Sequence, residues 1–306
     1  MQSSTFVTIL MSGLAEGVLY SLVGVGLVMI YNGSKVINFA FGDVIAILAY
    51  ITYTLFGIVH SAAGVFVCLA IISALIGYAL RYLIVDAQER TLRPVLRIRG
   101  RFADDTVLKM IVSTIGISLI IQGLEPAIWG GQPLKLPISF PPGNMTLFGA
   151  NVPVADFAMI VPSAAVLVAL WLFLKYTRIG FDIRATFDNA YGANLVGIDI
   201  PRIFTVVWII GCLIAGVAVV LTSPIIYVTS TSYESFAFIA FVAVVLGGLD
   251  SVPGAIIGGL VVGIATTLID SYLSPGMEQV IMFVFTIAIL VVRPTGILSH
   301  PVQDRV

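Results

Sequence analysis

The stretch GLAEGVLYSLVGVGLVMIYNGSKVINFAFGDVIAILAY, residues 13–50, places two long apolar runs on either side of a short polar segment. About 20 consecutive apolar residues are needed to cross the hydrocarbon core of a bilayer. We therefore expect membrane spans over residues 6–30 and 36–57. These two spans indicate a chain whose backbone polar groups are satisfied within helices, as lipid requires.

Seven further apolar runs lie at residues 62–84, 107–128, 154–174, 203–221, 237–249, 254–272 and 278–292. The composition, with 59% hydrophobic and 10% charged residues and a mean hydropathy of +1.09, leaves too little polar surface for a soluble protein. We expect an all-α fold, a polytopic transmembrane helical bundle of about 8–10 spans that forms a single domain over residues 1–306. Because the run at 237–249 is short for a full span, some spans are expected to be broken or re-entrant.

The basic residues fall into alternate gaps between the apolar runs. The gap from Arg81 to Lys109 holds seven of them and the gap from Lys175 to Arg202 holds four, whereas residues 129–153 hold only Lys135 and residues 222–235 hold none. Loops rich in Lys and Arg remain in the cytoplasm. We therefore expect residues 86–106 and 176–200 inside, residues 131–152 outside, and a multi-pass protein of the bacterial inner membrane. The outer loop is rich in Pro, Gly and Asn, which predicts an irregular or hairpin-like lid.

The junction of the first two spans gathers polar side chains. They are Asn32, Ser34, Lys35, Asn38 and Asp43. An unpaired polar group in hydrocarbon costs a few kcal/mol, so these groups should face protein or a water-filled path. Two interpretations stay open at this point, a lining for a translocation pathway and a set of interhelical hydrogen bonds that fixes the bundle.

Glu16 lies inside the first apolar run, on the helical face of Ser12 and Tyr20. A carboxylate inside a membrane is a functional candidate by default. A span that begins later than residue 6 would instead leave Glu16 in the outer interface. The candidates for a translocation pathway are therefore Glu16, Asn32, Asn38 and Asp43.

The inner loop at residues 176–202 carries an amphipathic pattern. Phe187, Tyr191 and Leu195 recur at i, i+4 and i+8, which predicts a short helix from Arg184 to Val196 after a turn at Gly180. We expect the helix to end near Gly197, with Pro201 opening the next span. Pattern alone allows a helix that rests on lipid headgroups as well as one that contacts another subunit.

Three segments together resemble the LivH-type permeases of branched-chain amino-acid ABC importers. Residues 177–221 match the family pattern of a coupling loop and its following span in Gly180, Arg184, Ala185, Asp188, Gly197, Ile198, Gly211, Ala215, Gly216 and Ala218. Residues 13–50 are similar to the N-terminal block, and residues 236–266 to the glycine-rich C-terminal block. The chain departs from the family in carrying Phe41 for a usual histidine, Asp43 for a usual glutamate and Val219 for a usual glycine.

The resemblance implies a permease subunit that translocates branched-chain or other small amino acids. Its implied partners are ABC ATPase subunits inside, a second homologous permease chain or a copy of itself, and a periplasmic substrate-binding protein outside, with no nucleic acid. It also implies that the inner loop is a cytoplasmic coupling helix docked on the ATPase through Arg184, Phe187, Asp188, Tyr191, Leu195 and Gly197. Related permeases carry urea or short amides, so that alternative stays open.

Catalytic chemistry has little support in the sequence. No GxxxxGK[ST] motif is present, so ATP hydrolysis needs another subunit. His60 and His300 have no ligand spacing around them, and Cys68 and Cys212 lie in apolar runs, so we expect no enzyme, cofactor or metal site. An ion-coupled secondary transporter is the main alternative, and a channel is a third, disfavoured because the sequence has no ring-forming filter signature. A secondary transporter would need paired intramembrane carboxylates, and Glu16 and Asp43 are the candidates that we identify.

The chain also contains a short motif that occurs twice in similar form. Ile30-Tyr31 precedes Phe39-Ala40-Phe41, and Ile226-Tyr227 precedes Phe236-Ala237-Phe238. Under the expected orientation the two spans run in opposite directions, which is the polarity of an inverted repeat with a site near the membrane midplane.

Overall fold

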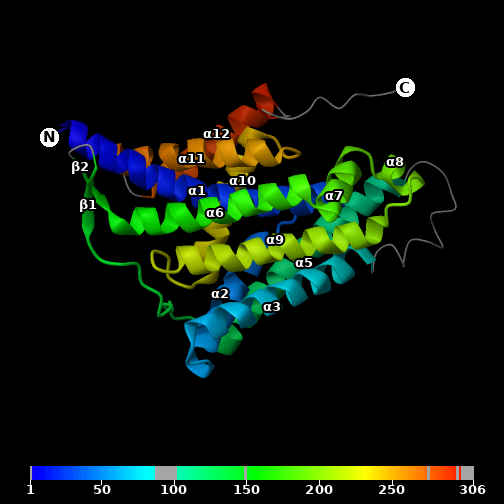
Figure 1. Ribbon diagram of the computed structural model, residues 1–306, viewed down its shortest axis with the longest axis horizontal. Coiled ribbons are helices and arrows are strands. Elements are labelled where there is room, and N and C mark those ends of the chain that lie inside the picture. The colour runs from blue at the N-terminus through cyan, green and yellow to red at the C-terminus, as the bar shows by residue number, and fades with distance from the viewer. Residues whose placement is uncertain (1, 87–101, 148–149, 274–275, 294–295, 298–306) are drawn as a thin grey trace. The chain divides into compact units, whose positions relative to one another are not determined.

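A computed structural model describes residues 2–86, 102–147, 150–273, 276–293 and 296–297 (Figure 1). In this part of the chain eight helices are long and apolar enough to cross a membrane, and a ninth apolar helix is shorter. The expected all-α polytopic bundle is confirmed. The centre of the basic loop that we place inside, residues 87–101, lies outside the described residues.

The helices follow the apolar runs of the sequence. They are α1 (Gln2–Ser34), α2 (Phe41–Ile58), α3 (Ala62–Arg81), the short π-helix η1 (Tyr82–Asp86), α5 (Phe102–Trp129), α6 (Val154–Tyr176), α7 (Arg178–Asp188), α8 (Ala190–Leu195), α9 (Ile200–Thr222), α10 (Ser230–Gly247), α11 (Val252–Tyr272) and α12 (Met277–Val292).

Several helices begin a few residues away from the predicted start, and for α2 and α10 the structure shows the reason. The span expected over 36–57 begins at Phe41, because Asn38 forms a turn before it, in which the Asn38 side-chain oxygen accepts a hydrogen bond from the Ala40 amide at 3.1 Å. The span expected over 237–249 begins at Ser230, where Thr229 Oγ1 accepts a hydrogen bond from the Ser232 amide at 3.1 Å. Hydropathy misses that first turn because its residues are mostly serine and threonine, so α10 is longer than expected.

The chain divides into two compact units, and three helices contribute to both. The first unit comprises residues 1–28, 138–168 and 235–306, and the second comprises residues 29–137 and 169–234. Three of the four unit boundaries fall inside α1, α6 and α10, and the fourth lies between residues 137 and 138, before β1.

Glycines bring the helices of the first unit into close contact. A Cβ on Gly17 of α1 would lie 2.9 Å from the Leu260 Cα of α11, and a Cβ on Gly259 would lie 2.6 Å from the Ser21 Cα. Ser21 Oγ donates a hydrogen bond to the Ile256 carbonyl at 2.8 Å, so α1 and α11 are joined by backbone contact and by a polar bridge. This is the small-residue packing that brings membrane helices together.

The loop before α6 contains a hairpin in the first unit. Strands β1 (Asn144–Leu147) and β2 (Ala150–Pro153) pair antiparallel, with Met145 opposite Val152. Thr8 Oγ1 donates a hydrogen bond to the Asn151 carbonyl at 3.1 Å, which ties the hairpin to α1. The expected hairpin-like segment is confirmed.

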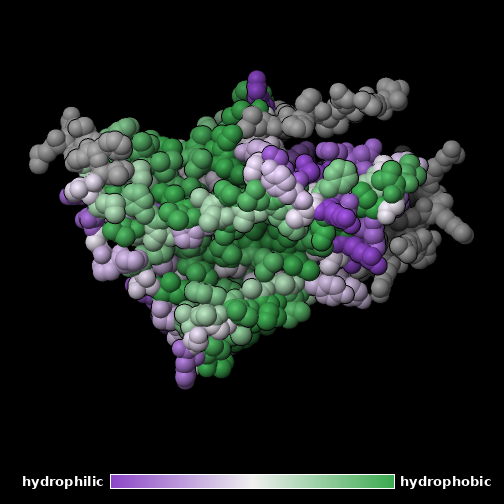
Figure 2. Space-filling model, in the orientation of Figure 1, coloured by the Kyte–Doolittle hydropathy of each residue, from purple (hydrophilic) through white to green (hydrophobic). Residues whose placement is uncertain are grey.

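In the second unit α9 lies against α2 and α3, and α2 also packs on α3 and α5. Trp208 of α9 is buried, and its backbone carbonyl approaches α3 where Gly77 leaves room, since a Cβ there would lie 2.7 Å from that oxygen. The helices α7 and α8 also contact α9. Figure 2 shows hydrophilic residues gathered around α7 and α8, next to largely hydrophobic spans.

Candidate functional site

The inner amphipathic segment forms two helices rather than the single helix predicted from Arg184 to Val196. Asn189, with φ −157° and ψ 96°, ends α7, and its side chain accepts a hydrogen bond from the Gly192 amide at 2.9 Å to begin α8. An asparagine that caps in this way favours a helix start over a helix interior. Phe187 and Tyr191 therefore lie on different helices, and the predicted continuous face is wrong.

The predicted turn at Gly180 is also wrong, because Gly180 lies in the first turn of α7. Thr177 caps that helix by accepting a hydrogen bond from the Gly180 amide at 2.9 Å. A Cβ on Gly180 would lie 2.6 Å from the Leu174 Cα, so the glycine lets α7 fold back against the end of α6. Ile183 and Thr186 continue this buried face.

The exposed face of the α7–α8 segment carries large apolar side chains. Tyr191 is 75% exposed, Leu195 70% and Val196 79%, whereas Phe187 is half-buried. Of the other predicted coupling residues, Arg184 and Asp188 are exposed, and Arg184 makes a long 3.5 Å contact to the Lys175 carbonyl. The structure thus brings Tyr191 and Leu195 together on α8 at the surface and leaves Phe187 on α7.

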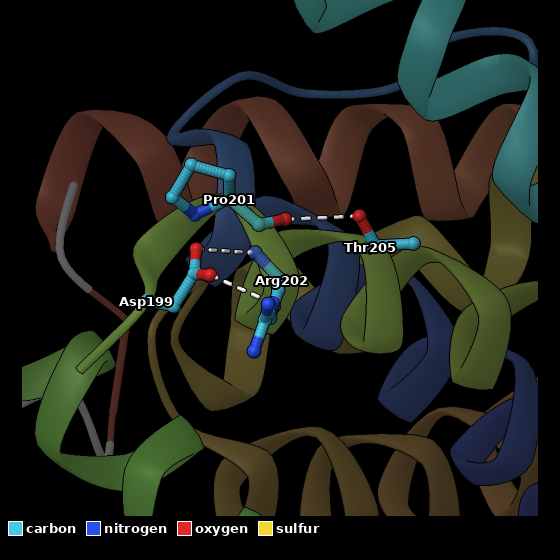
Figure 3. Close-up of polar contacts among 4 residues, drawn as sticks. All are labelled: Asp199, Pro201, Arg202 and Thr205. Atoms are coloured by element: carbon cyan, nitrogen blue, oxygen red, sulfur yellow. Dashed lines mark hydrogen bonds and ion pairs between the residues drawn. The ribbon is translucent and has the colours of Figure 1, made fainter.

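A tight joint connects α8 to α9. Gly197 has a φ of +91°, and the Ile198 amide donates to the Ala193 carbonyl at 3.1 Å, the geometry with which glycine commonly ends a helix. Asp199 then caps α9 through the Arg202 amide at 3.3 Å, and its other oxygen lies 2.8 Å from Arg202 Nε (Figure 3). Figure 3 also shows Thr205 Oγ1 bonded to the Pro201 carbonyl. This joint places α8 directly before α9, which packs against α2 and α3.

A second site lies among the spans of the second unit, where α5 faces α2. Asp43, in the first turn of α2, is buried and accepts hydrogen bonds from Ser118 Oγ at 2.6 Å and from Gln122 Nε2 at 3.0 Å. Asp43 therefore joins α2 to α5 through hydrogen bonds, as the interhelical interpretation predicts. Both carboxylate oxygens are occupied by donors from one face of α5.

Glu125, which sequence reasoning missed, continues that face of α5. It is fully buried, and its Oε2 accepts a hydrogen bond from Ser230, the first residue of α10. Its Oε1 is buried and has no hydrogen-bond partner among the described residues. We call Asp43, Ser118, Gln122, Glu125 and Ser230 the α2–α5 cluster. The signal in the sequence was the i, i+4, i+7 spacing of polar residues 118, 122 and 125 within an apolar run.

The remaining pathway candidates do not join this cluster through any described hydrogen bond. Asn32 is buried and accepts from Lys35 Nζ at 3.1 Å. The buried amide nitrogen of Asn38 has no partner in the described part of the chain. Glu16 belongs to the first unit, where it is half-buried and accepts a 3.3 Å hydrogen bond from Thr267 Oγ1.

A bundle of apolar helices with buried polar residues and a short helical segment between two spans is typical of a transport permease. The family model for the permease component of branched-chain amino acid transport systems matches residues 9–290. The chain belongs to this family, and it is a multi-pass inner-membrane protein.

Its relatives match over almost their whole length. The high-affinity branched-chain amino acid transport system permease protein LivH of Escherichia coli K12 is 31% identical over 98% of both chains. BraD of Pseudomonas aeruginosa, described in the same words, is 31% identical over 97% of both. A probable LivH of Methanocaldococcus jannaschii is 28% identical over 90% of this chain and 87% of that protein.

Proposed function

We propose that this chain is the permease subunit of an ABC importer that moves branched-chain amino acids across the inner membrane. The observation that carries the proposal is the alignment of nearly the whole chain with high-affinity branched-chain amino acid permeases. A permease of this kind needs ATP hydrolysis by cytoplasmic ATPase subunits, a second permease chain or a copy of itself, and a periplasmic binding protein that delivers the cargo.

The α7–α8 segment is the proposed contact with the ATPase. The exposed Tyr191, Leu195 and Val196 form an apolar surface beside charged residues, as a docking helix requires. Burying one such large side chain in a partner groove contributes about 1.5–3 kcal/mol. Gly197 and the Asp199 cap connect this surface to α9, so that ATPase closure would move the spans of the second unit.

Asn38 and Asp43 support a translocation role for the beginning of α2. Both are buried, and Asn38 retains an unpartnered donor among the described residues. A buried polar atom without a partner in hydrocarbon is costly and is retained most often where a substrate or water passes. Asn32 and Glu16 remain proposals of the same kind, each with a described hydrogen-bond partner.

Uptake of a cargo panel tests the function. The complex with its ATPase is reconstituted into proteoliposomes that contain ATP, with the binding protein outside, and radiolabelled leucine, isoleucine, valine, urea and acetamide are compared. We expect uptake of the three amino acids and of neither amide. Uptake of urea or acetamide without leucine would assign the chain to the amide carriers of the family.

A further inference from the structure

The α2–α5 cluster lies on one face of α5, where two other helices begin, with Asp43 and Glu125 buried and Ser118, Gln122 and Ser230 half-buried. Ser118 is close to the middle of the 22-residue span from Leu108 to Trp129. Asp43 occupies the first turn of α2, and Ser230 is the first residue of α10. All five residues belong to the second unit.

One acceptor atom of the cluster, Glu125 Oε1, receives no hydrogen bond from the described residues. Each carboxylate oxygen of Asp43 accepts one hydrogen bond, from Ser118 or from Gln122, and Glu125 Oε2 accepts one from Ser230. Among the described residues Glu125 Oε1 has no hydrogen-bond partner, although the side chain is fully buried.

The described residues offer the two carboxylates, Asp43 and Glu125, no ion-pair partner. The helix N-termini of α2 and α10 supply only partial positive charge. A buried carboxylate with an open acceptor position is stabilised by a cation that also donates hydrogen bonds.

An ammonium group fits these requirements better than a metal ion. Among the described residues no group of three or more His, Cys, Asp or Glu side chains is arranged to hold a metal. Glu125 instead offers one open oxygen, with the hydroxyl of Ser230 beside it. An alkylammonium group carries three donors and a single charge, and one of the donors can satisfy Oε1.

We propose that Glu125 binds the α-ammonium group of a zwitterionic amino acid during translocation. Hydrogen bonds from Ser118 and Gln122 of α5 hold the neighbouring Asp43 in place. The inference rests on the proposed function and adds a residue that selects the class of cargo. A neutral amide or sugar would leave the buried carboxylate uncompensated, so Glu125 favours cargo with an amino group.

Ligand-induced thermal stabilisation of the wild-type permease–ATPase complex in nanodiscs, at constant ionic strength in KCl, tests the chemistry directly. Leucine and 3-methylbutylamine, which both carry an ammonium group, should raise Tm, whereas 4-methylpentanoate, which lacks it, should not. Equal stabilisation by 4-methylpentanoate would overturn the assignment. Stabilisation by sodium but not by the amine, or by none of the compounds at millimolar concentration, would overturn it too.

The variant Glu125→Gln keeps the side-chain shape and removes the charge. We expect leucine uptake to fall at least about tenfold, equivalent to about 1.4 kcal/mol, and stabilisation by leucine to disappear, while the complex still assembles. The matched control is Asp156→Asn, a buried carboxylate of the first unit that accepts a 2.8 Å hydrogen bond from Ser12. The control should retain uptake within about twofold of wild type, because an amide oxygen still accepts that bond.

Wild-type leucine uptake by Glu125→Gln, or an equal loss in Asp156→Asn, would overturn the proposal. If Glu125→Gln fails to assemble, Glu125→Asp keeps the charge and should retain stabilisation by 3-methylbutylamine; its loss in an assembled complex counts against the site. A wild-type complex that takes up no branched-chain amino acid would refute the proposed function, whereas normal wild-type uptake with an unaffected Glu125→Gln refutes the ammonium site alone.

Discussion

At the scale of single residues, side chains that cap helices and glycines that permit close approach determine the geometry. Thr177, Asn189 and Asp199 begin three successive helices by accepting hydrogen bonds from backbone amides. Their residue types are those expected at helix starts. Periodicity favoured one helix through Asn189, because the apolar spacing continues across it. The break between α7 and α8 follows from the Asn189 side chain, which caps the start of α8 and so competes with a continuous helix.

The buried polar residues were predicted unevenly. Asp43 was identified because it stands near other polar residues, whereas Glu125 belongs to a sparser pattern, with Gln122 and Ser118 three and seven residues before it in an apolar run. Ser230, the partner of Glu125, lies far along the chain on α10, so no local pattern connects them. A contact of that kind is found only when the fold brings the two helices together.

The contact between Ser21 and Gly259 makes a testable residue-scale prediction. In Gly259→Ala the new Cβ would lie 2.6 Å from the Ser21 Cα, so α1 and α11 must separate. We expect a cost of about 1–3 kcal/mol, seen as a lower Tm of the purified complex. Gly116→Ala is the control, because no atom lies within 4 Å of a Cβ there. An equal Tm for both variants would contradict the tight packing.

Asp43→Asn tests the bonds at the start of α2. The amide oxygen can still accept from Gln122 Nε2 and the new NH₂ can donate to the Ser118 hydroxyl, but both bonds lose the charge of the carboxylate. We expect stability to fall by about 1–3 kcal/mol and uptake to fall further than assembly. Paired measurement of complex yield and leucine uptake separates the two effects. Wild-type uptake would remove Asp43 from the pathway.

At the scale of elements, hydropathy located every long helix, and its errors lie at helix ends. The beginning of α10 was missed since Ser230 and its neighbours are polar. The similar motifs at residues 30–41 and 226–238 also do not share a helix boundary, because Phe41 begins α2 whereas Phe236 lies inside α10. The two motifs therefore occupy different helix positions.

The α7–α8 segment makes the element-scale prediction. Tyr191→Asp places a charge on the exposed apolar face of α8, and burying that charge in a partner groove is costly. We expect weaker co-purification of the ATPase and a loss of uptake, with normal insertion into the membrane. Ile225→Asp, an exposed apolar position beyond the opposite end of α9, should leave co-purification unchanged. Unchanged co-purification in Tyr191→Asp would contradict the docking role.

At the scale of the whole molecule, the distribution of Lys and Arg predicts the orientation. In a background in which Cys68 and Cys212 are replaced, single cysteines at Asp188 and Asn151, both exposed, report the two sides. An impermeant thiol reagent should label position 151 in intact cells and position 188 only after the membrane is opened. The reverse labelling pattern would show an inverted topology.

The central claim is that ATP hydrolysed by a partner drives branched-chain amino acids through this chain. Leucine uptake is therefore measured in proteoliposomes that hold the permease–ATPase complex with the binding protein outside, once with internal ATP and once with only an ion or proton gradient. The account predicts uptake against a gradient with ATP and none with the ion gradient alone. Uptake driven by the ion gradient in the absence of ATP would contradict it and identify a secondary transporter.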